Sequence, residues 1–288
     1  MQRKLIATAL LALGITAAHA DEPLQLKVYN AGPGSFNVNS VLITGATEAI
    51  VIDAGFTRAD ALRIAANVLD SGKRLTTILV SQADPDYYFG VETLKSIFPD
   101  AAVVAAPAVL DKIKAKLPTK LSFWGPKMGT NAPQHPVLPT PLSGNTLTVD
   151  GQTIVLRGAS GELAHRPYYW VPSLRALVGN IAVFGNMHVW TADTPTVAQR
   201  QAWVAQLDEM KALQPAIVVP GHMAAGTPID SVAAIDFTRD YLLRFDAEAQ
   251  QAKDSAALID AMKRAYPTLP PSMSLDIGAK VVTGEMKW

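Results

Sequence analysis

The sequence predicts a layered α/β fold, in which β-sheets are covered by helices. β-Branched runs of strand length, such as 49–52 and 102–106, alternate with longer segments in which apolar residues recur at helical spacing. Glycine or proline interrupts the chain between these segments, as expected for short connections. Chains that alternate strands and helices in this way pack as layers around a shared core.

The first half of the chain combines a strand meander with helices and further strands. Thr57 and Asp60 have the spacing of a capping box, and Gly72 ends the helix that they begin. The apolar stripe of this helix is expected to lie on the sheet. The expected elements are strands over 24–29, 41–45, 49–52 and 102–106, and helices over 57–72, 91–98 and 107–117.

Residues 122–140 interrupt this alternation. The segment, SFWGPKMGTNAPQHPVLPT, is rich in proline and glycine and has no periodicity. Long irregular segments within a domain are often binding loops or lids, and Trp124 would then offer an aromatic surface. The alternative is a connector in which Trp124 covers the core. The sequence favours neither over the other.

The second half begins with a hairpin, because Asp150-Gly151 is a strong turn signal between two alternating runs. Thr194-Pro195 opens a helix with one apolar stripe. The expected strands are 146–149, 153–157, 168–171, 176–178 and 216–219, and the later helices are 230–249 and 256–266.

The chain is organised around the segment 76–90, TTILVSQADPDYYFG. A buried run ends there in a polar turn that carries Asp84 and Asp86. Pro85 has no N–H to donate and disfavours helical geometry at the residue before it, so strand pairing should stop. Two carboxylates that point into one concavity need a cation, a proton or several donors. The alternative is a solvated surface turn, against which the apolar strand and the aromatic residues around it argue.

Residues 1–20 have the pattern of a secretory signal peptide. Arg3 and Lys4 precede a short apolar run that ends in a small-x-small cleavage site. The run is too short for a membrane anchor, and no basic flank follows it. The mature chain is expected to begin at Asp21 and to be secreted, in the periplasm of a Gram-negative cell, without stable membrane insertion. Residues 21–288 are expected to form one domain.

Charge and cysteine content exclude several function classes. The whole chain has 25 basic and 25 acidic residues, and without Arg3 and Lys4 the mature chain keeps 23 basic against 25 acidic ones. This balance gives no electrostatic footprint for nucleic acid. Cysteine is absent, which excludes thiol catalysis and thiolate metal ligands. The expected partner is a small-molecule substrate or ligand.

Four segments, in order, resemble the metallo-β-lactamase fold superfamily. LVSQADPDYYFG resembles the metal-binding turn of that family, Ser/Thr-His-x-His-x-Asp-His. NVNSVLITGATEAIVIDAGF resembles the opening hairpin with its strand-end Asp53, VPSLRALVGN the later strand pair, and IVVPGHM the strand that ends in the last ligand His. The resemblance runs from about Leu26 to Met223. It implies an αββα sandwich, with two sheets back to back and helices outside.

The metal-binding turn is matched only in part. Its first His position holds Gln82, and its second His position holds Asp84. Its Asp is kept as Asp86, whereas its last His position holds Tyr87. A carboxylate at the second position can still serve as a metal ligand.

The later ligand positions are also altered. The next His ligand would fall near Glu162 or His165, and the sequence does not choose between them. The bridging Asp position holds Asn180, while His222 matches the last His. The resemblance therefore implies a degenerate metal site and argues against a two-metal centre.

One function that follows is a secreted hydrolase. Asp84, Asp86 and His222 would hold one zinc, iron or manganese ion, with open positions for water. A metal-bound hydroxide would attack an ester, lactone or amide, while Tyr87 or Asn180 stabilises the oxyanion. Weaker candidate ligands are Gln82, Glu162 and His165.

The alternative is a metal-free member of the fold that binds a small molecule or is otherwise repurposed. The replacements in the turn exchange ionisable ligands for groups that form hydrogen bonds. The pocket of such a protein would be lined by Tyr87, Trp124, His188 and Trp190.

Overall fold

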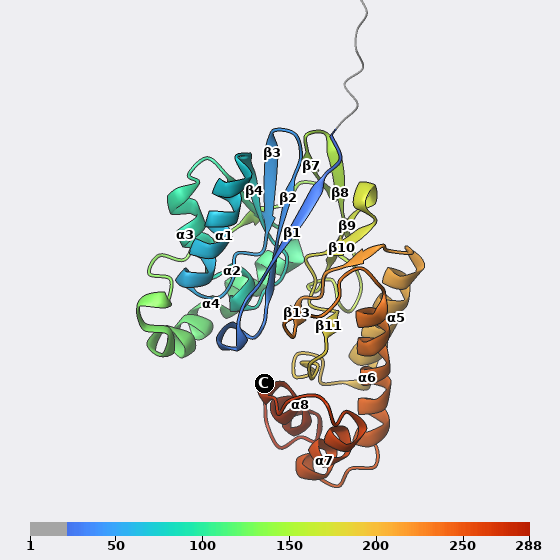
Figure 1. Cartoon of the computed structure of the whole chain (residues 1–288). Helices are drawn as coiled ribbons and strands as arrows, with labels where there is room; N and C mark the ends of the chain where they lie inside the picture. The colour runs from blue at the N-terminus through green and yellow to red at the C-terminus, as the bar shows by residue number, and fades with distance from the viewer. Residues whose placement is uncertain (1–21) are drawn as a thin grey trace, which may run out of the picture.

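The computed structural model describes residues 22–288, so the predicted signal peptide lies outside the described residues. The predicted αββα sandwich is confirmed. Two β-sheets stand side by side in the upper part of the molecule, with helices on their outer faces (Figure 1). Among residues 22–288, no helix is both long and apolar enough to cross a membrane.

The first sheet has six strands in the order β1-β2-β3-β4-β5-β6. β1, β2 and β3 pair antiparallel as a meander, and β3 to β6 pair parallel. The parallel strands are joined through helices, as such strands require. The strands are β1 (Gln25–Asn30), β2 (Asn39–Thr44), β3 (Glu48–Ile52), β4 (Arg74–Val80), β5 (Ala102–Ala105) and β6 (Thr140–Pro141).

The second sheet has five strands in the order β12-β10-β9-β8-β7. Asp150 and Gly151 both have positive φ, 45° and 79°, as the predicted hairpin turn between β7 and β8 requires. The short strands β11 and β13 form a separate parallel pair. The strands are β7 (Thr146–Val149), β8 (Gln152–Arg157), β9 (Tyr168–Val171), β10 (Ala176–Val178), β11 (Phe184–Gly185), β12 (Ile217–Val218) and β13 (His222–Met223).

Helices cover the outer face of each sheet. α1, α3 and α4 lie beside the first sheet, α5 and α6 lie beside the second, and α7 and α8 extend the second half downward (Figure 1). The helices are α1 (Arg58–Ser71), α2 (Pro85–Tyr88), α3 (Val91–Ile97), α4 (Pro107–Met128), α5 (Val197–Ala212), α6 (Ala233–Ala249), α7 (Ser255–Ala265) and α8 (Met273–Val282).

The main core lies between the sheets and extends beneath the helices of the first half. Ile50 and Ile52 of β3, Ile78 of β4 and Tyr169 of β9 are all buried within one apolar cluster. A second cluster joins β11 to α5, α6, α7 and α8, and includes Trp203 and Tyr241. Burial of this much apolar surface is the main source of stability.

Helix α1 begins with the predicted capping box. The Thr57 hydroxyl accepts the Asp60 N–H at 3.0 Å, and the Asp60 carboxylate accepts the Thr57 N–H at 3.0 Å. Gly72 ends the helix with φ of 65°. We expect Thr57→Ala to lower the free energy of unfolding by about 1 kcal/mol, since it removes the cap, and Thr57→Ser to have little effect. Urea denaturation of the two variants measures the difference.

Helix α4 is longer than predicted. The sequence predicts its end at residue 117 and an irregular segment over 122–140, but the helix continues to Met128 and encloses Pro118 and Pro126. Both prolines are exposed, so the carbonyls that they leave without an N–H partner can be hydrated. Trp124 anchors the extension through edge contacts with Phe36 and Phe56, at ring centroid distances of 5.5 and 5.3 Å. The Trp therefore packs on the core cluster, as the connector alternative expects.

Two further α-helices also differ from the prediction. The expected polar turn at 84–86 is the start of a one-turn helix, α2, because Pro85 suits the first helical position. Helix α8 is not predicted at all, although Leu275 and Ala279 are buried on its inner face. Its short length, its central glycine and the prolines before it hide the helical period.

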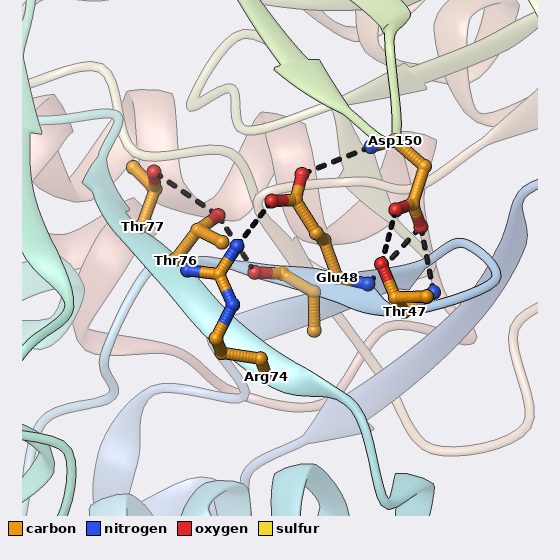
Figure 2. Close-up of polar contacts among 7 residues, drawn as sticks. Thr47, Glu48, Arg74, Thr76, Thr77 and Asp150 are labelled. Carbon is orange, nitrogen blue, oxygen red and sulfur yellow. Dashed lines mark hydrogen bonds and ion pairs between the residues drawn. The ribbon is translucent and has the colours of Figure 1, made fainter.

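A polar cluster joins the two sheets where β3 and β4 begin, at the end opposite their carboxyl ends. The Asp150 carboxylate accepts hydrogen bonds from the Thr47 N–H and hydroxyl at 2.9 and 2.5 Å, and from the Glu48 N–H at 3.0 Å. Glu48 also accepts the Asp150 N–H at 3.1 Å and pairs with Arg74, as Figure 2 shows. The hydrogen bonds that the Asp150 carboxylate accepts lower its pKa, and those from Thr47 contribute most. The cluster fixes the hairpin of one sheet to the hairpin of the other.

Candidate functional site

The candidate site lies where several strands of both sheets end. β4 ends before Asp84 and Asp86, β10 ends before Asn180, and β12 is followed closely by His222. Parallel strands place their carboxyl ends along one edge, which is why residues far apart in sequence meet here.

Asp53, which follows β3, binds the segment directly after the neighbouring strand β4. Its buried carboxylate accepts the Ser81 N–H at 2.8 Å and the Ser81 hydroxyl at 2.7 Å. The residue has φ of 68°, a left-handed conformation that Asp tolerates better than most residues. Burial raises the pKa of Asp53 to about 8, although the two bonds from Ser81 oppose the rise. Asp53 therefore fixes the position of the segment that leads to Asp84.

Asp86 and His222 form a buried pair. The His222 Nε2 lies 3.5 Å from an Asp86 carboxyl oxygen. The other ring nitrogen, Nδ1, lies 3.0 Å from the Phe36 carbonyl oxygen, which can only accept a hydrogen bond. The Nδ1 must therefore carry a proton, and a neutral ring presents the Nε2 lone pair to Asp86. The ring is packed between Phe184, stacked at 5.3 Å, and Tyr87, edge-on at 5.6 Å.

Burial decides where the proton of this pair resides. It raises the pKa of Asp86 to about 7 and lowers the pKa of His222 to about 4. Although 3.5 Å is also an ion-pair distance, both shifts favour uncharged groups. Between about pH 4 and pH 7 we therefore assign the proton to Asp86 and leave His222 neutral.

Asp84 points to a different neighbour. The Asp84 side chain is 30% exposed to solvent, and the Lys120 ammonium of α4 lies 3.6 Å from the Asp84 carboxylate. Burial, with the Asp193 and Asp86 carboxylates, raises the pKa of Asp84, and Lys120 opposes this. The pKa of Asp84 thereby reaches about 7, as does that of Asp86. The lower exposure of the Asp86 side chain, 8% against 30%, favours the proton on Asp86.

Four residues from separate parts of the chain form a row of contacts beside Asp84, and we call this row the rim. Its members are Lys120, Trp288, Asp193 and Trp190. The Lys120 ammonium lies 5.5 Å from the Trp288 ring centroid. The Trp288 indole N–H donates to Asp193 at 2.9 Å, and the Trp190 indole N–H donates to the other Asp193 oxygen at 2.6 Å. Trp190 therefore contacts Asp193 in this row, and the sequence did not point to Lys120, Asp193 or Trp288.

The sequence also missed Arg166, a buried cation in the segment before β9. Its side chain is 3% exposed, and its guanidinium carbon lies 4.3 Å from the Trp203 ring centroid. Burial lowers its pKa, while the Asp193 and Asp84 carboxylates raise it. The same charge disfavours protonation of His222. A charged residue directly before a proline and a buried strand was the only signal in the sequence.

The amide groups that replace family ligands are used in structural hydrogen bonds. The Gln82 amide donates to the Pro167 carbonyl at 2.8 Å. The Asn180 amide donates to the Val219 carbonyl and its oxygen accepts the Val183 N–H, both at 2.9 Å. These bonds orient the Asn180 side chain, and its NH2 group carries a second N–H besides the one donated to Val219.

Of the four remaining predicted residues, His188 lies in the core, Tyr87 lies within the site, and Glu162 and His165 belong to the segment that carries Arg166. Glu162 is exposed and His165 is half-buried, with a pKa lowered mainly by burial. His188 is buried in the second core cluster, where its Nδ1 lies 2.9 Å from the Tyr241 hydroxyl of α6. Tyr87 is buried at the site, and its hydroxyl makes a long hydrogen bond of 3.5 Å to the Asn180 carbonyl.

The side chains at the strand ends do not fit the metal that the fold family implies. Throughout residues 22–288, no three His, Asp or Glu side chains are grouped as metal ligands. Asp86 and His222 come together, but Asp84 is turned to Lys120. The Arg166 guanidinium supplies a fixed positive charge near the carboxylates. The predicted metal assignment thus stays a prediction that this geometry does not favour.

The comparisons with known proteins agree with the fold. A sequence model of the metallo-beta-lactamase superfamily matches residues 33–222. A metallo-beta-lactamase family protein from Thermus thermophilus is 17% identical, with 91% of each chain covered and a TM-score of 0.61. DIM-1 metallo-beta-lactamase is 16% identical, with 77% of this chain and 96% of that chain covered and a TM-score of 0.54. No curated protein sequence matches the chain. At these identities the structural likeness concerns the fold alone.

Proposed function

This chain belongs to the metallo-β-lactamase superfamily and has its hydrolase-like fold. Within this family, we propose that it is a metal-independent member that binds a small molecule at the strand ends. One observation carries the proposal. A carboxylic acid paired with a neutral imidazole, Asp86 with His222, stands where the family fold would hold metal ligands. The fixed charge of Arg166 supplies the positive potential that a metal ion would otherwise provide.

The surroundings of the pair support a binding role. Protonated Asp86 is a hydrogen-bond donor, and neutral His222 is an acceptor through Nε2. The aromatic rings of Tyr87 and Phe184 pack on the His222 ring. A few polar groups within an aromatic wall are typical of small-molecule sites.

A single-metal hydrolase is the second candidate. The His222 ring is held by a backbone carbonyl through Nδ1 and offers Nε2 toward a carboxylate, an arrangement also typical of metal-bound histidines. Rotation of Asp84 away from Lys120 would be needed to bring a third ligand. Bound metal would lower the pKa of a water molecule for attack on an ester, lactone or amide.

Elemental analysis separates the two candidates. Protein purified without chelator or affinity metal, and then supplied with zinc, manganese and iron, is expected to retain no stoichiometric metal after dialysis. Asp86→Asn and His222→Gln should leave the trace metal content unchanged, because these residues bind none. A stoichiometric metal that both substitutions remove would overturn the proposal and favour the hydrolase.

We also propose that the protein is exported after cleavage before Asp21, on the basis of the leader pattern in residues 1–20. Cell fractionation with N-terminal sequencing tests this. Asp21 at the mature terminus in the periplasmic fraction is the expected result, and intact Met1 in the cytoplasm would contradict it.

A further inference from the structure

Arg166 has donors that the described residues leave unused. Its Nε and Nη2 are buried and have no hydrogen-bond partner within residues 22–288. No carboxylate among residues 22–288 lies within 4.0 Å of its nitrogens, although Asp84 and Asp193 influence its charge. A buried guanidinium with unpaired N–H groups is strongly disfavoured, so such a group calls for a partner outside the described side chains.

The two unpaired nitrogens lie on one edge of the guanidinium. Nε and Nη2 point their N–H bonds in parallel, and this edge matches the two oxygens of a carboxylate. The face of the guanidinium is already covered. The ring centroid of Trp203 lies 4.3 Å from the guanidinium carbon of Arg166. Gln206 holds the Arg166 backbone through a 2.9 Å bond to its carbonyl. The fork is therefore held in a fixed orientation before any ligand arrives.

We propose that the Nε and Nη2 edge of Arg166 binds the carboxylate of a small monoanionic ligand. This inference rests on the proposed function and names the class of ligand that the site takes. Charge favours a monoanion over a phosphate dianion, because Asp84 and Asp193 already lie near the guanidinium and would repel a second negative charge.

The rim beside Asp84 provides the way in. Lys120 belongs to α4, Trp288 follows α8 and Asp193 lies in the loop before α5, so their contacts join three separate elements. Lys120 keeps 20% and Asp84 30% of the side-chain exposure, so solvent reaches this rim.

Arg200 is a matched control within the same molecule. It is 1% exposed, as buried as Arg166, but its Nε pairs with Asp246 and its Nη1 donates to the Thr194 carbonyl at 2.8 Å. A ligand that seeks a free guanidinium edge should therefore ignore Arg200. General effects of salt on buried arginines should affect both residues equally.

The test follows the arginine Nε–H signals by NMR while acetate is added to the purified full chain. We expect a saturable shift of the Arg166 signal, no shift of the Arg200 signal, and no shift with acetamide, the neutral isostere. Arg166→Lys, which keeps charge but loses the fork, should weaken acetate binding about tenfold or more by calorimetry. Arg200→Lys should leave that affinity within about twofold.

The outcomes separate clearly. An unmoved Arg166 signal, an equal response to acetamide, or a stronger response to inorganic phosphate would overturn the inference. If Arg166→Lys does not fold, the wild-type Nε signal is assigned by its proximity to the Trp203 ring and the titration still decides. Metal content is measured on the same sample, so failure of the metal-independent function is seen separately from failure of acetate binding.

Discussion

Replacing Gly221 with alanine should lower the free energy of unfolding by about 3 kcal/mol, and so lower Tm by roughly 6–12 °C. A Cβ at this position would lie 2.1 Å from the Asn180 carbonyl oxygen and 2.6 Å from the Tyr87 hydroxyl. The backbone has little room to retreat. The Gly221 N–H donates to the Val183 carbonyl, and the Gly221 carbonyl accepts the Asn39 N–H, each at 2.9 Å.

The substitution should also disturb the site, because His222 follows Gly221 directly. Gly32→Ala is the control, since a Cβ there meets nothing within 4 Å and the backbone is extended, with φ of −73° and ψ of 175°. We expect this control to change stability by less than about 0.5 kcal/mol. Equal Tm values for the two variants would mean that the strand ends do not approach as closely as described.

The fold could be predicted because its signals are local. The capping box of Thr57 and Asp60 and the turn of Asp150 and Gly151 each act within a few residues, and both are confirmed. The end of α4 could not be predicted in the same way. Proline normally ends a helix, but here Trp124 packs on the core and holds the helical backbone beyond Pro118. A tertiary contact thus overrides a local preference.

The same distinction applies to the candidate site. Asp86 and His222 each follow a recognisable strand, β4 and β12, so their meeting follows from the order of motifs. Arg166 is fixed instead by Trp203 and Gln206 of α5, two residues far along the chain that carry no motif. His188 shows the converse, because its neighbour Tyr241 draws it into the second core cluster.

Where the family has metal ligands, this chain has carboxylates with cationic side chains nearby. A site with two carboxylates, Asp84 and Asp86, needs positive charge or protons in order to be buried. In this chain Lys120 pairs with Asp84 at 3.6 Å, and Arg166 adds a second, more deeply buried cation. Asp86 is left to hold a proton. The electrostatic balance is thus achieved by side chains alone, which makes the protonation of Asp86 the most informative quantity to measure.

Asp86→Asn should change how stability depends on pH. An unfolded Asp titrates near pH 4, whereas burial raises the pKa of folded Asp86 to about 7. The folded chain therefore keeps a proton that the unfolded chain loses, and wild-type stability falls as pH rises from about 4 to about 7. The amide of the variant cannot titrate. Relative to wild type, the variant should gain on the order of 2 kcal/mol between about pH 5 and pH 8, measured by urea denaturation.

Asp53, Asp84 and His222 are present in both proteins, but the Asp86 charge also raises the pKa of Asp84 and of Asp53. The measured difference therefore reports Asp86 together with its effect on these two neighbours. Asp150→Asn provides a control of opposite sign, since hydrogen bonds from Thr47 lower the pKa of Asp150. Its contribution is lost only on acidification through the pKa of the folded state, so its effect should be equal at about pH 5 and pH 8. If Asp86→Asn instead gains nothing relative to wild type between about pH 5 and pH 6, and gains only above about pH 6.5, then Asp86 is an anion paired with a His222 imidazolium, because that pair keeps its proton up to the ordinary pKa of His. The charged pair would then replace the neutral one on which the proposed binding site depends.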